Sequence, residues 1–142
     1  MLALRDDLDG LRLVEPGNPD VWLVFQGRRH RVAGPQVYDA LFNEAERLVH
    51  SDEIAAIAMG SELNKGTCLV RATGHHAIFL VTGRYPNVVR YHIPTFESFS
   101  DFGFTLDAVK DVPPILLDAM TLGEDITSLA DRNRRGGSAP AA

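Results

Sequence analysis

The sequence predicts an α+β fold made of two tandem β-β-β-α-α units of about 60 residues, which share one core around a pseudo-twofold axis. Three observations lead to this prediction. The apolar and basic stretch at residues 21–32 recurs in a longer form at residues 78–93, the apolar and turn positions around it repeat about 56 to 63 residues apart, and each copy closes at a glycine, Gly60 or Gly123. A unit of this length buries its apolar face poorly alone, so we expect the two to pack together.

Length and composition fit one domain. The chain has 142 residues, of which 45% are hydrophobic, and a formal charge of −5. We expect an N-terminal arm at 1–9, one domain of two repeats at 10–63 and 66–126, and a disordered tail at 128–142, where the composition is too polar to form a core. No apolar run is long enough to cross a bilayer, and Asp6, Asp7 and Asp9 stand where a signal peptide would be apolar. These features predict a cytoplasmic protein that binds no membrane, and the negative charge argues against nucleic acid as a partner.

The first repeat begins with a short strand at 11–14 and a turn at 16–19, followed by the hairpin at 21–32 with Gly27 in its turn. Pro35 is suited to the first turn of a helix that runs to about Asn43. A second helix is expected after the N-cap residue Ser51, with Ile54, Ile57 and Ala58 as its buried face and Gly60 as its end.

The second repeat follows the same order. A strand around Leu69 precedes a hairpin whose strands flank a loop at 83–87. Thr95 is placed to cap a helix that carries Phe96, Phe99 and Phe102, and residues 111–114 start another that carries Ile115, Leu116 and Ala119. Aromatic residues at helical spacing favour a role in the core.

The repeated residues also resemble a known kind of module. The matching positions are 21–24 and 27–32 in the first unit, and 66–71, 78–81, 91–94 and 112–123 in the second. They resemble a bacterial tandem-repeat binding module, and a chain of two such units is similar to the small accessory proteins of crocagin-type peptide natural-product biosynthesis. The resemblance implies a non-catalytic protein that holds a precursor peptide for modifying enzymes, or that binds glycans. Ala33 stands where the second unit has Pro94, and His50 where it has Pro113, which implies unequal binding by the two halves.

The second strand of each hairpin supplies the candidate binding residues. Alternation places Arg29 and Arg31 on one face of the strand and Arg28, His30 and Val32 on the other. If that strand ends its sheet, its backbone could accept an extended peptide by strand addition while the arginines hold acidic side chains; the alternative is an ordinary solvated edge. The predicted peptide-binding residues are Trp22, Arg28, Arg29, His30, Arg31, Arg90, Tyr91 and His92. Trp22 is either an exposed anchor or a core residue.

No set of residues indicates catalysis. The nucleophile motif Gly-x-Ser-x-Gly, the phosphate-binding motif Gly-x-x-x-x-Gly-Lys and the dinucleotide-binding motif Gly-x-Gly-x-x-Gly are absent from the sequence, so we expect no catalytic residues and no cofactor. His75 and His76 are adjacent and would point to opposite faces of a strand, so we expect no metal site there. Cys68 lies in an apolar stretch without a basic neighbour in sequence, which predicts a buried, inert thiol.

Together these observations predict a non-enzymatic peptide-binding accessory protein that captures an extended precursor peptide by strand addition. The alternative is a carbohydrate-binding module that stacks sugars on Trp22 and Tyr85. Uncovered sheet edges and several aromatic residues favour a homodimer.

Overall fold

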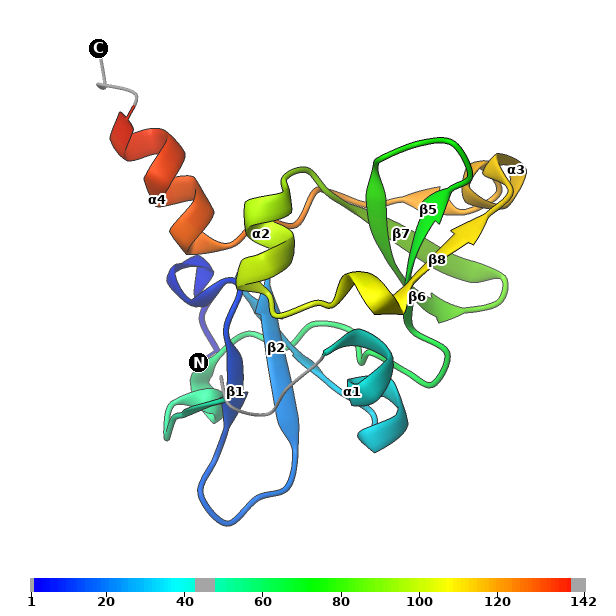
Figure 1. The fold of residues 1–142 in the computed structure, drawn as a ribbon. Helices are drawn as coiled ribbons and strands as arrows, with labels where there is room; N and C mark the ends of the chain where they lie inside the picture. The colour runs from blue at the N-terminus through cyan, green and yellow to red at the C-terminus, as the bar shows by residue number, and fades with distance from the viewer. Residues whose placement is uncertain (1, 43–47, 139–142) are drawn as a thin grey trace.

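The structure is a computed structural model in which residues 2–42 and 48–138 are described. It has a mixed α+β fold with two sheets (Figure 1). The first sheet has the strand order β3-β2-β1-β4 and the second has the order β8-β5-β6-β7-β9. None of the described helices is long and apolar enough to cross a membrane.

The first sheet is built around the predicted hairpin. Its strands are β1 (Arg12–Val14), β2 (Val21–Phe25), β3 (Arg28–Arg31) and β4 (Leu48–His50). The hairpin turn is formed by Gln26 and Gly27, which both have positive φ angles, 54° and 74°, as a two-residue turn with the twist of its strands requires. Strand β4 runs parallel to β1, whereas the other pairs are antiparallel. Helix α1 (Pro35–Leu41) begins at the predicted proline.

The second sheet repeats this pairing. Its strands are β5 (Cys68–Ala72), β6 (Ile78–Arg84), β7 (Asn87–Ile93), β8 (Val109–Val112) and β9 (Thr121–Leu122). Strand β6 pairs antiparallel with both β5 and β7, as β2 does with β1 and β3. Strand β8 pairs parallel with β5, as β4 does with β1. Strands β6 and β7 extend up to Tyr85 and Pro86, so the loop predicted at 83–87 is only two residues long. Helices α2 (Phe96–Asp101), α3 (Pro114–Asp118) and α4 (Leu129–Ser138) complete the half.

The main core lies between the two sheets and takes residues from both halves. It joins Leu23, Phe25 and Leu41 to Leu69, Leu80 and Phe99 in one cluster of buried side chains. Smaller clusters occupy the opposite face of each sheet. Phe99 and Phe102 are buried as predicted, but Phe96 is 60% exposed. The two halves therefore depend on each other for their main apolar core.

Several predicted elements differ from the structure. Ser51 does accept a hydrogen bond from the Glu53 N–H, but only one 3₁₀ turn (Ile54–Ala56) follows it, and the chain then becomes extended. Helix α3 buries Leu117 instead of the predicted Ile115 and Leu116. Strands β4, β8 and β9 were not predicted, because two to four residues are too few to show a period.

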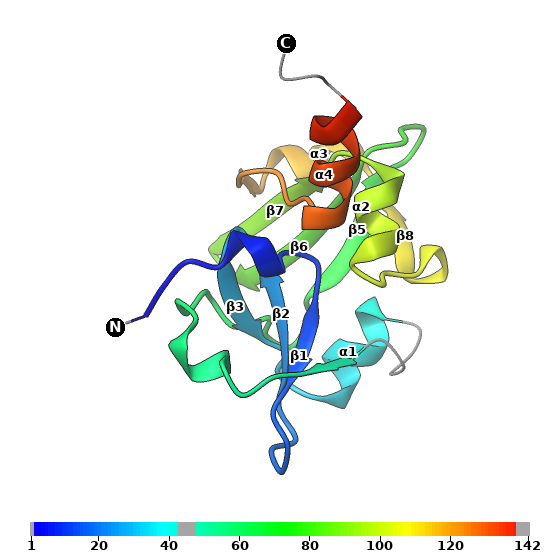
Figure 2. The same ribbon diagram turned by 90° about the vertical axis from the view of Figure 1, so that its left-hand side faces the viewer.

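Helix α4 covers residues 129–138 of the segment predicted as a disordered tail from residue 128, and residues 139–142 lie outside the described part of the chain. This helix is held by polar contacts. Asp131 accepts hydrogen bonds from Thr95 Oγ1 at 2.6 Å and Ser98 Oγ at 2.9 Å, and Arg132 Nη1 donates to Asp9 Oδ2 at 3.0 Å. A prediction based on the lack of apolar residues could not detect this form of attachment. In Figures 1 and 2, α4 lies beside α2 and the N-terminal segment.

Candidate functional site

The outer edge of β3, predicted to receive a peptide, is occupied by the chain itself. The Arg29 N–H donates to Ala58 O at 3.0 Å, and the N–H groups of Gly60 and Leu63 donate to Arg29 O and Arg31 O, each at 2.8 Å. The stretch at 58–63 thus runs parallel along β3, with bridges at Met59 and Leu63. Strand addition at this edge was therefore a wrong prediction.

The same coverage is found in the second half. Strand β9 pairs in parallel with β7, and Gly123 N–H donates to Arg90 O at 2.9 Å. Further along, Ile126 N–H donates to His92 O at 3.0 Å. In both halves the chain after the closing turn returns along the hairpin, so neither β3 nor β7 offers a free edge to a partner.

Two of the candidate residues, His30 and Tyr91, belong to the core. The His30 ring is 3% exposed and stacks on Phe25, with ring centroids 3.6 Å apart and planes 2° apart. Its Nδ1 lies 2.8 Å from Ser61 O and its Nε2 lies 3.3 Å from Phe25 O. Tyr91 meets the same Phe25 ring edge-on at 5.5 Å. The prediction from alternation that His30 and Val32 lie on the other face of the sheet from Arg29 and Arg31 is confirmed.

Burial lowers the pKa of His30 below its ordinary value of 6.5, and the facing carbonyls only partly oppose this shift. Because the folded pKa is depressed, folding disfavours protonation. Stability should therefore fall as the pH drops below about 6.5 toward the folded-state pKa, by at most about 1.4 kcal/mol per pH unit. Urea titrations at pH 7.5 and 5.5 should show this loss. His30→Gln should abolish it, and His75→Gln, at an exposed histidine, should not; an unchanged pH dependence in His30→Gln would contradict the assignment.

The arginines of β3 already have partners within the chain. Arg31 donates to Glu62 Oε2 at 2.8 Å and to Asp20 Oδ1 at 3.3 Å. Arg28 is exposed and donates to Met59 O at 3.3 Å. Arg29 stacks over the Trp22 ring at 4.4 Å and donates from Nε to Ile57 O at 3.1 Å. Arg29 covers a ring of Trp22, which reduces the aromatic surface open to a sugar.

Arg90 occupies the corresponding place on the second sheet but has a different environment. Its guanidinium carbon lies 4.9 Å from the centre of the Phe79 ring, and the His92 ring packs on Phe79 at 5.2 Å. Asp125 Oδ1 lies 3.6 Å from His92 Nδ1. Among the described residues no hydrogen-bond acceptor or ion-pair partner contacts the guanidinium of Arg90, and its Nε is buried. A partly desolvated guanidinium in this state gains from a carboxylate that can accept its hydrogen bonds.

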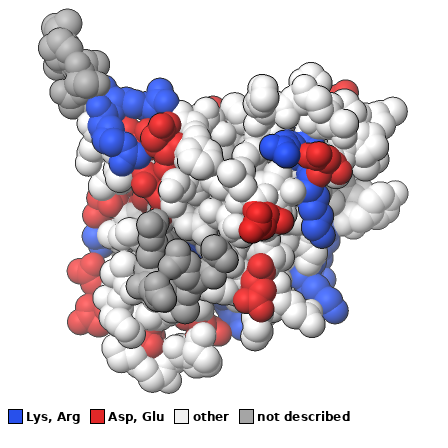
Figure 3. Space-filling model, viewed as in Figure 1, with Lys and Arg blue, Asp and Glu red and all other residues white. Residues whose placement is uncertain are grey.

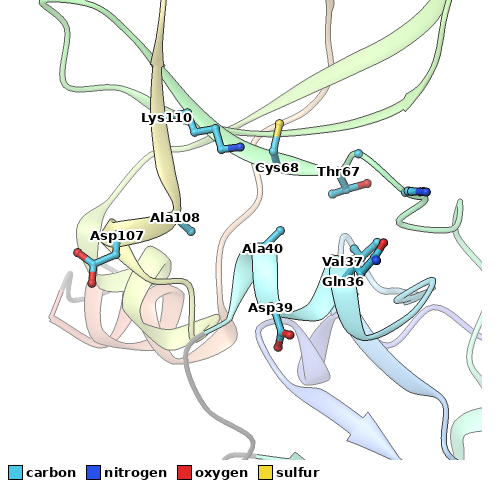
Figure 4. Close-up of a pocket in the computed structure, with 11 residues that line it drawn as sticks. Gln36, Val37, Asp39, Ala40, Thr67, Cys68, Asp107, Ala108 and Lys110 are labelled. Atoms are coloured by element: carbon cyan, nitrogen blue, oxygen red, sulfur yellow. The ribbon is translucent and has the colours of Figure 1, made fainter.

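A cavity of about 450 Å³ lies between the two halves (Figure 4). Helix α1 contributes Gln36 and Asp39, and β5 and β8 contribute Cys68 and Lys110. Cys68 is partly buried, and burial raises its pKa although Lys110 acts in the other direction. Cys68 therefore does have a basic neighbour in the fold, Lys110, and the prediction of none was wrong. Because its pKa is raised, the thiol stays protonated at neutral pH and is a poor nucleophile.

A second hollow of about 340 Å³ lies at the tip of the β6–β7 hairpin. Its lining includes Tyr85, which is 93% exposed, together with Asn87, Arg84 and Glu62. This is the arrangement of an aromatic face and polar side chains that suits a sugar ring. His75 and His76 are exposed, and over the described residues no group of three His, Cys, Asp or Glu side chains could hold a metal ion.

The structure brings together Arg90, His92 and Phe79, of which Phe79 was not predicted as a site residue. The repeat alignment contained the signal, because Trp22 of the first unit aligns with Phe79 of the second. On the face shown in Figure 3, acidic and basic side chains are interspersed without a continuous basic area. Comparisons of the chain with protein-family models, with curated proteins and with solved structures gave no match.

Proposed function

We propose that this protein is a non-catalytic peptide-binding accessory protein of the cytoplasm, which holds an extended precursor peptide for partner enzymes of a peptide natural-product pathway. The observation that supports it best is Arg90. Its guanidinium is backed by Phe79, lies on the same face as His92, and has no acceptor in the described part of the chain. An acidic side chain of a bound peptide would supply that acceptor. The expected homodimer stays a prediction.

The proposal includes internal duplication with a pseudo-twofold relation between the halves. The order β3-β2-β1-β4 of the first sheet corresponds to the order β7-β6-β5-β8 in the second sheet. Each hairpin turn is also contacted by a segment that follows a closing glycine: Gln26 Nε2, in the first turn, donates to Glu124 O at 2.9 Å, and Asn64 Nδ2, between the two units, donates to Gly83 O, beside the second turn, at 3.0 Å. Duplication explains why Arg29 stacks on Trp22 and Arg90 on Phe79. The two arginines differ in that only Arg29 has a backbone acceptor for its Nε.

Replacing Arg90 with alanine tests the proposal. The probe is a fluorescein-labelled (Val-Glu)₄ peptide, with (Val-Gln)₄ as the neutral comparison, and binding is followed by anisotropy. A charge-assisted hydrogen bond contributes about 1.5–3 kcal/mol, so Arg90→Ala should weaken binding of (Val-Glu)₄ by about tenfold or more. Arg84→Ala, at an exposed arginine on the same sheet, is the matched control and should bind as the unaltered protein does. Equal binding of both peptides, or no effect of Arg90→Ala, would reject the proposal.

Carbohydrate binding is the second candidate, and Tyr85 favours it. Its ring is almost fully exposed above a hollow lined by amide and charged side chains. A glycan array separates the two functions, because a sugar ligand should be lost in Tyr85→Ala and kept in Arg90→Ala.

A further inference from the structure

A hollow of about 500 Å³ lies beside helix α1. Its apolar lining includes Val21, Val32, Ala33 and Tyr38, which all belong to the main core or pack against it. The size is within the range of about 300–1,000 Å³ that small-molecule sites have. All of the lining residues come from the first half, so the hollow is separate from the second-sheet surfaces discussed above.

The ring of Tyr38 forms one wall of the hollow and is held in place by its neighbours. Its hydroxyl accepts a hydrogen bond from Arg12 Nη1 at 2.7 Å. The ring also packs on Phe42, with centroids 4.9 Å apart. Arg12 and Phe42 are themselves buried, at 2% and 3% exposure. A ligand that enters the hollow therefore meets a preorganised aromatic surface, which lowers the entropic cost of binding.

The second half indicates which kind of group suits this place. Helices α1 and α2 start in the same register, because Tyr38 N–H and Phe99 N–H each donate to the carbonyl four residues before them, at 3.0 and 3.1 Å. Tyr38 therefore matches Phe99, and Pro35 matches Phe96. The ring of Phe96 stacks on Phe99, with centroids 5.7 Å and planes 22° apart. In the first half Pro35 lines the hollow instead, so the position that carries a ring in the second half carries none here.

The charged side chains at the hollow favour a cation. Asp20, Arg31 and Asp39 line it. Arg31 already donates to Glu62 at 2.8 Å and to Asp20 at 3.3 Å. In the described part of the chain the side chain of Asp39 has no hydrogen-bond or ion-pair partner, and in Figure 4 its carboxylate points away from Lys110. Asp39 is thus available at the rim for a positively charged group.

We propose that this hollow binds an aromatic ring that carries a positively charged amino group. The ring stacks on Tyr38 as Phe96 stacks on Phe99, a geometry that aromatic pairs prefer, and the amino group pairs with Asp39. Such a ligand is either a free aromatic amine or the N-terminal aromatic residue of a peptide. The inference rests on the duplication proposed above, which matches the two halves, but it does not depend on peptide binding at Arg90.

The probe is tryptamine, titrated into the ¹⁵N-labelled full chain and followed through the amide signals of Val32, Ala33 and Gly34. These signals should shift with a dissociation constant of about 1 mM, as a ligand of this size allows. Indole-3-propionate has the same ring with a negative charge and should bind about fivefold more weakly or less. The tripeptide Trp-Gly-Gly-amide separates the two sources: tighter binding than that of tryptamine identifies a peptide N-terminus, and equal or weaker binding identifies a free amine.

Two variants test the ring and the charge separately. Pro35→Phe gives the first half the residue that Phe96 is in the second, and it should weaken tryptamine binding at least tenfold because its own ring fills the hollow. Gln36→Phe, at the next position of α1 and outside the hollow, is the matched control and should bind as the unaltered protein does. Asp39→Asn should remove the preference for tryptamine over indole-3-propionate.

Urea unfolding shows whether Pro35→Phe is folded, and Asp39→Asn gives the second readout if it is not. The inference would be overturned if tryptamine left the three amide signals unchanged, if folded Pro35→Phe bound it as well as Gln36→Phe does, or if Asp39→Asn kept the full preference. Should (Val-Glu)₄ bind through Arg90 while tryptamine does not bind, only the hollow is refuted. The reverse result refutes the proposed function alone.

Discussion

Replacing Gly60 with alanine should destabilise the protein by about 2–3 kcal/mol, as expected for overpacking at a site that cannot relax. A Cβ atom at this position would lie 2.6 Å from Nδ1 and 2.7 Å from Nε2 of His30. The ring has no room to withdraw, because it stacks on Phe25 and is hydrogen-bonded to Ser61 O. The measurement is the free energy of unfolding in urea.

Two further variants make this prediction specific. Gly34→Ala is the control, since its Cβ would meet no atom within 4 Å and its backbone is extended at φ 165°; it should cost less than about 1 kcal/mol. Gly123→Ala should repeat the effect of Gly60→Ala, because its Cβ would lie 2.6 Å from Cε1 of Tyr91. In a His30→Ala background the cost of Gly60→Ala should largely disappear. An additive double variant would show that His30 does not press on Gly60.

The elements that the sequence predicted correctly all have a local cause. The hairpin at residues 21–32 and helix α1 follow from period, a turn glycine and a proline in a first turn, and each of these signals lies within a few residues. Thr95 likewise caps α2 by accepting the Ser98 N–H at 3.0 Å. The sequence singled out Gly60 and Gly123 as matching positions and interpreted them as the ends of helices. In the structure they are needed because an aromatic ring packs against each.

What the sequence did not predict depends on contacts distant along the chain. The return of residues 58–63 along β3 has no periodic signal, so the site was placed on an edge that is covered. The pairing of Arg31 with Glu62 and the stacking of Arg29 on Trp22 could not be read from spacing either. Of the predicted binding residues, Arg90 and His92 stay together on the outer face, whereas His30 and Tyr91 pack in the core.

Replacing Asp131 with alanine should cost about 3 kcal/mol and release α4 from the domain. Asp131 is 2% exposed, and it accepts hydrogen bonds from Thr95, Ser98 and, at 3.3 Å, Arg135. Its removal leaves the fully buried Ser98 hydroxyl without its acceptor, and it removes the carboxylate that Arg135 Nε contacts at 3.3 Å. Asn133→Ala, at an exposed position of the same helix, is the control and should change stability by less than about 0.5 kcal/mol.

The effect should also depend on pH in a way that identifies its cause. Burial opposes the charge of Asp131, but the hydrogen bonds from Thr95, Ser98 and Arg135 outweigh it, and its pKa is lowered from 3.8. Its contribution is therefore complete above about pH 4 and is lost as the pH falls through the folded-state pKa. Asp131→Asn should be less stable than the unaltered protein at pH 7, with a difference that shrinks at pH 2–3. If hydrogen exchange of the α4 amides were as slow in Asp131→Ala as in the unaltered protein, the helix would be held by its apolar contacts instead.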